Sequence, residues 1–324
     1  MDTTATRGGT GAVDGEGGRA PTSRPARASR HSDVRSTFRR IACLGGIELL
    51  CAQAGVKPAA RGGLAGGAFP VHSHDEYTIV RIEAGRSAFL AGDRVWRAEG
   101  GALVVIGPGV PHCGGATDGV PVRYRSIVVP KAVMGIAGAA WNGVDAGTLA
   151  MPVFQRPIVQ DPALSAAFGV LHERLMALPD PKHECEALRA LLRELVLRHA
   201  TPEAGESARE PRRIRVVREH LAQNLTESAS LDRLSDLVGV SPFYLQRTFK
   251  AATRMSPREY LTDLRIKRAR ELLREGVTPR VVAGRVGFFD QSHFTRAFRR
   301  LTGLTPGQYG AGEVVVANGV EAGV

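Results

Sequence analysis

Between about residues 41 and 130, short apolar runs alternate with glycine-rich turns. Three of these runs read YTIVRIEAG, SAFLAGDRVWRAEGG and ALVVIGPGVPH. Apolar runs of this length, bounded by Gly and Asp, are typical of strands joined by tight turns. Several short strands at this spacing predict a sandwich or a barrel, and we assign it to residues 41–160.

After residue 160 the apolar positions recur every three or four residues, which is the period of a helix. A break at Pro179-Asp180-Pro181 divides them into two series. The pattern therefore predicts a helical hairpin over 161–200, which either supplies a dimer face or packs on the barrel. The apolar positions are Leu164, Phe168, Leu171 and Leu175 in the first series, and Leu188, Leu191, Leu192, Leu195 and His199 in the second.

Three segments lack such a pattern. Residues 1–40 are rich in Gly, Ala, Ser, Thr and Arg, so we expect a disordered tail. They contain no apolar block of 7–15 residues and do not look like a secretory signal. The segment 201–211, TPEAGESAREP, has the composition of a linker. We expect it to join the first domain to a helical domain over 212–310, which a C-terminal tail over 311–324 follows.

The helical region contains the same unit twice. Residues 238–260 read VGVSPFYLQRTFKAATRMSPREY, and residues 286–309 read VGFFDQSHFTRAFRRLTGLTPGQY. A shift of 49 positions matches Phe249 to Phe298 and Pro257 to Pro306, together with four further pairs. A repeat at this spacing indicates two copies of one structural unit.

Each copy has the turn and capping residues expected of a helix, a tight turn and a second helix. In the first copy Gly239 permits a left-handed turn, Ser241 can cap the next helix, and Pro242 takes its first position. In the second copy Gly287 and Asp290 take the parts of turn and cap. This is the plan of the helix-turn-helix motif.

One face of each second helix suits DNA. Arginine can bond guanine through two hydrogen bonds, glutamine can do so to adenine, and lysine neutralises phosphate. An ordinary helical bundle with solvated charge is the alternative, but two copies with matching faces favour DNA. The candidate DNA-binding residues are Phe243, Gln246, Arg247 and Lys250 in the first copy, and Gln291, Ser292, Thr295, Arg296 and Arg299 in the second.

The net charge of +11 strengthens this interpretation because it is unevenly distributed. Residues 209–310 hold 20 Lys and Arg against 10 Asp and Glu, an excess of +10. A local excess of this size points to a polyanionic partner. No apolar run approaches the roughly 18 residues of a membrane span. The four cysteines show no C-x-x-C spacing, so we expect reduced thiols in a cytoplasmic protein.

The segment VGFFDQSHFTRAFRRLTGLTPGQY resembles the second helix-turn-helix signature of AraC/XylS-type transcriptional regulators. The resemblance covers about 211–310. It implies two helix-turn-helix units joined by a long helix at about 257–274, with recognition helices in major grooves about 34 Å apart. Two positions depart from the pattern. Arg254 stands where the second copy has Gly303, which makes a left-handed helix end less comfortable there. Phe289 occupies a turn position where small polar residues are usual.

The segments 69–85 and 100–112 resemble the two motifs of a cupin barrel, as in the sensor domains of the same family. The candidate effector-binding residues are His72, His74, Tyr77, Trp96 and His112. Three imidazoles could hold a transition metal. However, the metal-binding motif has a glutamate about four residues after its second histidine, where this chain has Thr78 and Ile79. We therefore favour histidines that line a small-molecule pocket, and expect neither a metal nor a cofactor.

The fold class that follows is α+β and multidomain, with a cupin-like barrel, a helical hairpin and an all-α double helix-turn-helix domain. The leading hypothesis is a cytoplasmic, effector-responsive transcription regulator that acts as an activator and is not an enzyme. Its expected partners are promoter DNA, a small molecule, RNA polymerase and a second copy of the chain, but not a membrane. Two alternatives stay open: a metal-dependent cupin enzyme with a DNA-binding tail, and a DNA-binding protein without an effector.

Overall fold

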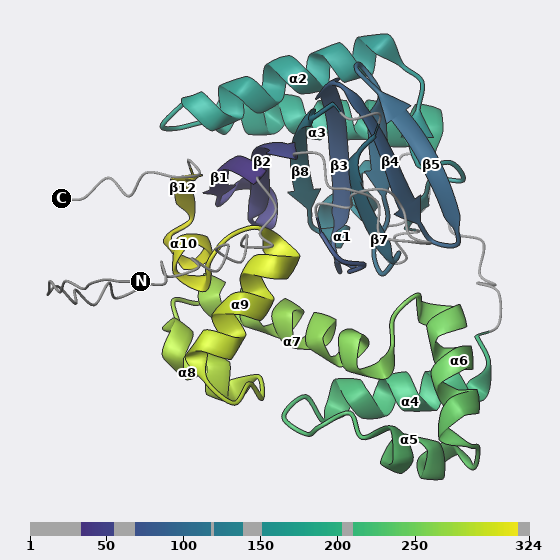
Figure 1. Ribbon diagram of the computed structural model, residues 1–324. Helices are drawn as coiled ribbons and strands as arrows, with labels where there is room; N and C mark the ends of the chain where they lie inside the picture. Colours follow the sequence, from purple (N-terminus) through teal and green to yellow (C-terminus); the bar gives the residue numbers. More distant parts are fainter. Residues whose placement is uncertain (1–33, 55–68, 118–119, 139–150, 203–209, 317–324) are drawn as a thin grey trace, which may run out of the picture. The chain divides into compact units, whose positions relative to one another are not determined.

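The structure is a computed structural model, and it describes residues 34–54, 69–117, 120–138, 151–202 and 210–316. Strands dominate the first part of the chain and helices the last (Figure 1). The longer strands are β1 (Val34–Ile41), β2 (Ile47–Ala54), β3 (Tyr77–Ala84), β4 (Arg86–Ala91), β5 (Arg94–Glu99), β6 (Leu103–Ile106), β7 (His112–Ala116) and β8 (Val122–Val129). Short strands β9 (Pro152–Val153), β10 (Ile158–Val159) and β11 (Thr201–Pro202) follow, and β12 (Glu313–Val316) lies near the C-terminus.

The strands form two main antiparallel sheets. The larger has the order β10-β6-β3-β8-β2-β1-β12, and the smaller has the order β5-β4-β7. A core of aliphatic and aromatic side chains, including Ile82, Phe89, Val104 and Val122, belongs to both sheets. The predicted sheet-rich N-terminal domain is confirmed. A further pair, β9 and β11, joins residue 153 to residue 201.

Residues 34–40 correct one sequence prediction. They were expected to belong to a disordered tail, but they form β1. This strand pairs with β2 along its whole length, from Val34 opposite Ala54 to Ile41 opposite Ile47. The strand buries Ser36 and Phe38 at alternate positions, so its burial has the period of two that a half-buried strand requires. The rest of the predicted tail lies outside the described residues.

The C-terminal segment gives a second correction. Residues 311–324 were expected to be a tail, but Glu313–Val316 form β12. This strand pairs with β1, with Phe38 opposite Val314. Without β12, β1 would be an edge strand with unpaired backbone groups, which are a template for another strand. The three consecutive valines of β12 favour extended backbone.

Two helices cover the face of the larger sheet that does not pack against the smaller sheet (Figure 1). Helix α2 (Pro162–Ala177) begins at Asp161, whose side chain accepts a hydrogen bond from the backbone N–H of Leu164, and helix α3 (Lys182–His199) follows the Pro-Asp-Pro break. Their fully buried side chains, such as Phe168 and Leu188, share one core with Ile79 of β3. Helix α1 (Lys131–Gly138) packs against α3.

The cysteines correct a third prediction, that of four reduced thiols. Cys43 and Cys185 are disulfide-bonded, whereas Cys51 and Cys113 are free. The two bonded residues are 142 positions apart in sequence, and the packing of α3 on the sheet brings their Cα atoms to 6.4 Å. Sequence spacing could not reveal a pair that only the tertiary fold brings together.

Between residues 212 and 311, all of which the structure describes, the chain forms seven helices: α4 (Arg212–Gln223), α5 (Leu231–Val238), α6 (Pro242–Thr253), α7 (Pro257–Arg274), α8 (Pro279–Arg285), α9 (Gln291–Thr302) and α10 (Pro306–Ala311). Their apolar side chains form two separate cores. Phe249 of α6 and Leu261 of α7 belong to the first, and Phe298 of α9 and Leu273 of α7 to the second. The predicted long helix over 257–274 is therefore confirmed, and it contributes to both cores.

Candidate DNA-reading face and effector pocket

The backbone signals predicted for the first helix-turn-helix unit are confirmed. Gly239 ends α5 in the left-handed conformation with φ +64°, and the Ser241 side chain accepts a hydrogen bond from the backbone N–H of Tyr244 at the start of α6. Leu245 and Phe249 of α6 are buried. The start and the rotation of the helix are therefore fixed by a cap and two core side chains.

The predicted reading face of α6 is exposed along its length. Phe243, Gln246, Arg247 and Lys250 are all exposed, and Phe243 keeps 75% of its surface. The Arg247 guanidinium lies 6.0 Å from the ring centroid of Tyr244. Tyr244 is 41% exposed, and the sequence analysis did not single it out. This face offers hydrogen-bond donors for base edges and phosphates, and apolar side chains can contact the thymine methyl group.

Helix α9 repeats this arrangement. The Asp290 side chain accepts a hydrogen bond from the backbone N–H of His293, and Phe294 and Phe298 are fully buried. The predicted residues Gln291, Ser292, Arg296 and Arg299 are exposed, and Thr295 is half-buried. Phe289, just before the cap, is 96% exposed, so the departure noted in the sequence places a bare aromatic ring beside this face.

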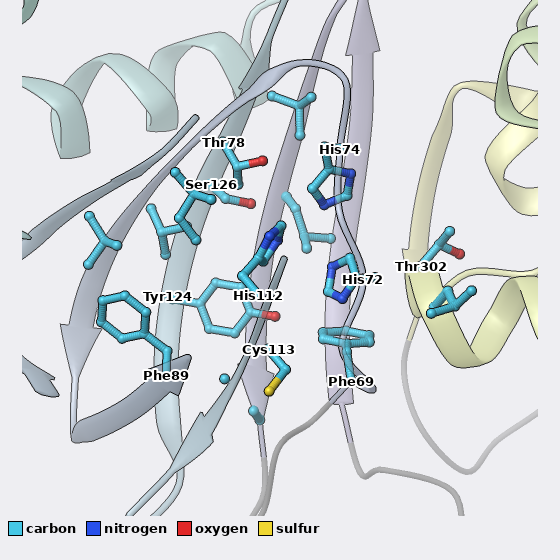
Figure 2. A pocket seen from close by; sticks show the side chains of 18 of the residues that line it. Phe69, His72, His74, Thr78, Phe89, His112, Cys113, Tyr124, Ser126 and Thr302 are labelled. Atoms are coloured by element: carbon cyan, nitrogen blue, oxygen red, sulfur yellow. The ribbon is translucent and has the colours of Figure 1, made fainter. Parts of the chain in front are cut away.

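A cavity of about 200 Å³ opens beside the smaller sheet. Figure 2 shows Phe69, His72, His112, Phe89 and Tyr124 around it. Thr78 and Ser126 add hydroxyl groups, while residues of α7, α9 and α10 complete the lining. A mostly apolar cavity with a few convergent polar groups is the usual form of a small-molecule site.

The five predicted effector residues do not all reach this cavity. His72, His74 and His112 line it, whereas Tyr77 and Trp96 are not among its lining residues. Tyr77 is 1% exposed and donates its hydroxyl hydrogen bond to the carbonyl oxygen of Pro152 at 2.7 Å. The effector role of all five residues stays a prediction. Tyr124 lines the cavity as well, and burial raises the pKa of its phenol so that it stays neutral.

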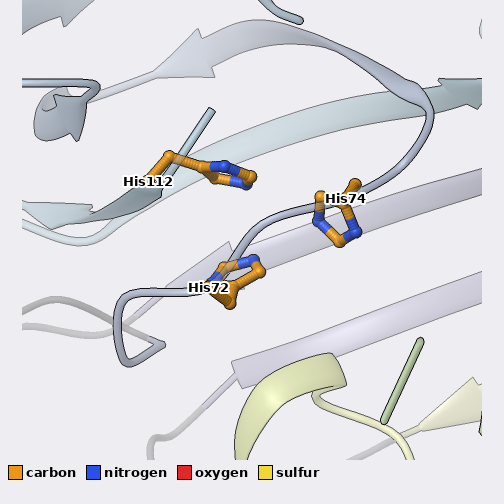
Figure 3. Close-up of side chains that lie close together, drawn as sticks. All are labelled: His72, His74 and His112. Carbon is orange, nitrogen blue, oxygen red and sulfur yellow. The ribbon is translucent and has the colours of Figure 1, made fainter. Parts of the chain in front are cut away.

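The three histidines of the cavity lie against one another (Figure 3). Their ring centroids are 4.4 Å apart for His72 and His112, 5.0 Å for His72 and His74, and 5.1 Å for His74 and His112. Burial lowers the pKa of His72 to about 4, that of His112 to about 3, and that of His74 well below its ordinary value. Neighbouring cations act in the same direction, so all three rings are neutral at pH 7.

A buried carboxylate, that of Glu48, belongs to the lining of this cavity. Glu48 of β2 accepts hydrogen bonds from Arg270 Nη2 at 2.8 Å, from Arg274 Nε at 3.0 Å and from the Tyr309 hydroxyl. Arg40 Nε approaches the same carboxylate at 3.6 Å. We call these five residues the Glu48 cluster. Sequence reasoning missed it because its members come from β1, β2, α7 and α10.

Nucleophilic chemistry finds little support at the cavity. Cys113 lines it, but burial raises the pKa of this thiol, so the reactive thiolate form is disfavoured. Cys113 is a small buried residue, with 9% of its surface exposed. None of the helices in the described ranges is long and apolar enough to cross a membrane.

Comparison with known proteins accords with both halves of this geometry. Residues 234–312 match the family model described as a helix-turn-helix domain, and residues 59–196 match an AraC-like ligand binding domain. The chain is 32% identical over 231 residues to the uncharacterized HTH-type transcriptional regulator YbfI of Bacillus subtilis (strain 168). That match covers 69% of this chain and 81% of YbfI.

Of two further relatives, RhaS matches over most of its length and RipA over about a third. The HTH-type transcriptional activator RhaS of Enterobacter sp. (strain 638) is 27% identical over 247 residues, covering 74% of this chain and 86% of that protein. The HTH-type transcriptional regulator RipA of Corynebacterium glutamicum is 38% identical over 104 residues, covering 32% of this chain and 31% of that protein.

The fold and the comparisons define a DNA-binding transcription regulator that joins a ligand-binding domain to a helix-turn-helix domain. The chain belongs to the AraC/XylS family of transcriptional regulators. The alternative of a metal-dependent cupin enzyme finds no support among these relatives, which are transcription regulators.

Proposed function

We propose that this regulator is a cytoplasmic activator whose DNA occupancy or polymerase contact responds to a small molecule in the cavity, and that it catalyses no reaction. The observation that carries the proposal is the pair of capped helices α6 and α9, each with an exposed basic face in the most positively charged part of the chain. The name of RhaS, a transcriptional activator, supports the sign of regulation.

We assign base reading to Arg247 and Arg296. Each is exposed in the first two turns of its helix, six residues after the N-terminal cap, and the N-terminal part of a recognition helix is what contacts base edges. Truncation of either residue to alanine should weaken operator binding by about 1–3 kcal/mol if it bonds guanine. Gel-shift titrations on a promoter fragment measure this loss. Arg189→Ala is the matched control, because it removes an exposed arginine of α3 without touching either helix-turn-helix unit.

Unchanged affinity and sequence preference in both Arg247→Ala and Arg296→Ala would remove this assignment of the reading faces. Lys250→Ala tests the phosphate contacts separately. It should weaken binding to all sequences alike and reduce the slope of log K against log salt by about one unit. A slope equal to that of the Arg189→Ala control would contradict a phosphate contact at Lys250.

A homodimer is the assembly we propose, with the outer face of α2 and α3 as its contact. Val170 on α2 is 57% exposed although it is apolar, and Leu178 follows the end of that helix at 37% exposure. Sedimentation of the full chain and of Val170→Glu tests this contact. A dimer that persists unchanged in the variant would exclude this face.

In vitro transcription from a footprinted promoter, with and without the regulator, tests whether the regulator activates RNA polymerase.

A further inference from the structure

His72 and His112 are held at fixed positions by their own backbones. Their backbone groups form an isolated antiparallel bridge, in which His72 N–H donates to the His112 carbonyl at 3.0 Å and His112 N–H donates back at 2.8 Å. With His74, two residues further along the chain, they place three ring nitrogens within 4.8 Å of one another. The site therefore needs little chain rearrangement to bring three imidazoles onto one ion.

The side-chain hydrogen bonds fix the tautomers of two of these rings. His72 Nδ1 lies 2.8 Å from the carbonyl oxygen of Pro70, and His112 Nδ1 lies 2.9 Å from that of Val110. A carbonyl oxygen can only accept, so both rings carry their proton on Nδ1 and leave a lone pair on Nε2. An Nδ1–H bonded to a backbone carbonyl, with the other nitrogen free, is how proteins orient histidines that bind metals.

His74 is held differently. Its Nδ1 lies 3.0 Å from Arg270 Nη1, and a guanidinium can only donate, so this nitrogen is the acceptor and Nε2 carries the proton. A metal bound at Nδ1 would take the lone pair that Arg270 uses. A metal bound at Nε2 would require the proton to move to Nδ1, where it would face the Arg270 donor. Either mode of ligation breaks the contact between His74 and Arg270.

The charges around the site do not exclude a cation. Arg270 and Lys267 both lower the pKa of His72 and of His74, and Arg274 and Arg40 lie close by in the Glu48 cluster. Four carboxylates pair with these four cations and balance them. The carboxylates are Glu48, Asp75, Glu76 and Asp263.

We propose that His72, His74 and His112 form a binding site for one divalent first-row transition-metal ion, and that the ion displaces Arg270 from His74. Imidazole ligands suit zinc, copper, nickel and iron rather than magnesium or calcium. Three protein ligands leave a coordination position for water or for an effector in the cavity. The consequence for DNA rests on the proposed function, but the metal site itself does not. The glutamate missing from the cupin motif removes a possible fourth ligand without removing these three.

The test uses the full chain, purified without a polyhistidine tag and freed of metal by a chelator. Titration with Co²⁺, followed by visible absorption, reports binding to nitrogen ligands, and competition with Zn²⁺ reports the affinity for zinc. We expect saturation at one ion per chain. His72→Ala and His112→Ala should each lower the affinity at least about 100-fold, since loss of a direct ligand should cost no less than loss of an outer partner. His183→Ala is the matched control, because His183 is exposed on α3.

Two measurements keep a folding defect apart from a loss of ligands. His74→Ala should also abolish one-to-one cobalt binding while its circular dichroism spectrum stays close to that of the control and its melting temperature stays well above the temperature of the titration. No saturable cobalt or zinc binding by the folded full chain would overturn the proposal, and so would equal binding by the control and all three histidine variants. The proposal would also be overturned if His183→Ala failed to bind the ion while the three histidine variants of the site still bound it.

The link to Arg270 has its own readout. Operator affinity of the full chain is measured with and without Zn²⁺, and a change that disappears in His72→Ala supports the displacement of Arg270. Equal affinity in both conditions, despite saturable binding, would overturn that displacement as a coupling step. Failure of the chain to bind DNA at all would instead refute the proposed function, while the cobalt titration would still decide the metal site.

Discussion

Replacement of Glu48 by glutamine is the sharpest test of the contacts that join β2 to α7. The substitution keeps the shape of the side chain and removes its charge. Glu48 is only 5% exposed, and both of its oxygens accept hydrogen bonds from buried or half-buried guanidinium groups. Glu48→Gln therefore leaves Arg270, which is 6% exposed, with Glu76 as its remaining carboxylate, at 3.6 Å.

The size of the effect follows from the pKa of Glu48. Burial by itself would raise this pKa, but Arg270, Arg274 and the Tyr309 hydroxyl outweigh burial and lower it from 4.5 to about 2. A difference of one pKa unit corresponds to about 1.4 kcal/mol, so the ionised carboxylate stabilises the folded state by about 3 kcal/mol. Loss of one partner from a buried ion pair costs about 3–5 kcal/mol, which agrees with this figure.

The pH dependence gives the test its sign. The folded pKa lies below the unfolded one, so the contribution is complete above pH 4.5 and disappears as the pH falls from 4.5 through 2. Urea unfolding of the full chain and of Glu48→Gln, followed by circular dichroism between pH 3 and 7, measures the difference in free energy of unfolding. We expect about 3 kcal/mol at pH 7 and a smaller difference at pH 3.

Glu186→Gln serves as the control, because it removes an exposed carboxylate of α3 outside the cluster. A difference between Glu48→Gln and the unsubstituted chain that stays constant from pH 7 to pH 3 would refute the electrostatic account. So would a Glu48→Gln variant as stable at pH 7 as the control.

Two further predictions concern the backbone and the disulfide. Arg254 ends α6 in the left-handed conformation with φ +61°, where a side chain costs about 1–2 kcal/mol, so Arg254→Gly should raise the free energy of unfolding by up to about 1 kcal/mol. Gly303→Ala, at the matching end of α9 with φ +80°, should lower it, and equal signs for the two changes would contradict the argument. The Cys43–Cys185 bond closes a loop of 142 residues, so reductant should lower stability by about 4–5 kcal/mol. Alkylation and mass spectrometry locate the bonded pair, and a melting temperature that reductant leaves unchanged would contradict this contribution.

The recognition helices could be predicted from the sequence because their signals are local. Ser241 and Asp290 cap helices that begin within one residue of them, and Gly239 and Gly303 end helices by their own backbone conformation. The repeat then doubled the information, since each copy checked the other. These signals need no knowledge of the rest of the fold.

The cavity could be predicted only in part because its lining depends on which face of a strand each residue occupies. In β3, Thr78, Val80 and Ile82 line the cavity. Tyr77 and Ile79 alternate with them and belong to the core shared with α2 and α3. Successive side chains of a strand point to opposite faces, so a shift of one position separates an effector-facing residue from a core residue. The presence of an aromatic side chain in the sequence does not show which of the two faces of the strand it occupies.

The Glu48 cluster lay beyond sequence reasoning for a different reason. Glu48 and Arg270 are 222 positions apart, and neither stands in a motif that predicts a charged partner. The strand β12 was missed in the same way, because its pairing partner β1 lies at the other end of the described chain. Long-range pairs of this kind appear only when the sheet and helices are assembled.

Helix α7 explains how an event in the cavity can reach both recognition helices. Its Leu261 belongs to the core that supports α6, its Leu273 belongs to the core that supports α9, and its Arg270 lines the cavity. A hydrogen bond to a charged group contributes about 1.5–3 kcal/mol, and coupling between two sites in a protein is commonly 1–3 kcal/mol. The single contact between Arg270 and His74 is thus large enough to carry the whole response. An occupant that leaves this contact and the Glu48 cluster unchanged has no differential contact with α7, and it could not shift DNA affinity through this helix however tightly it bound.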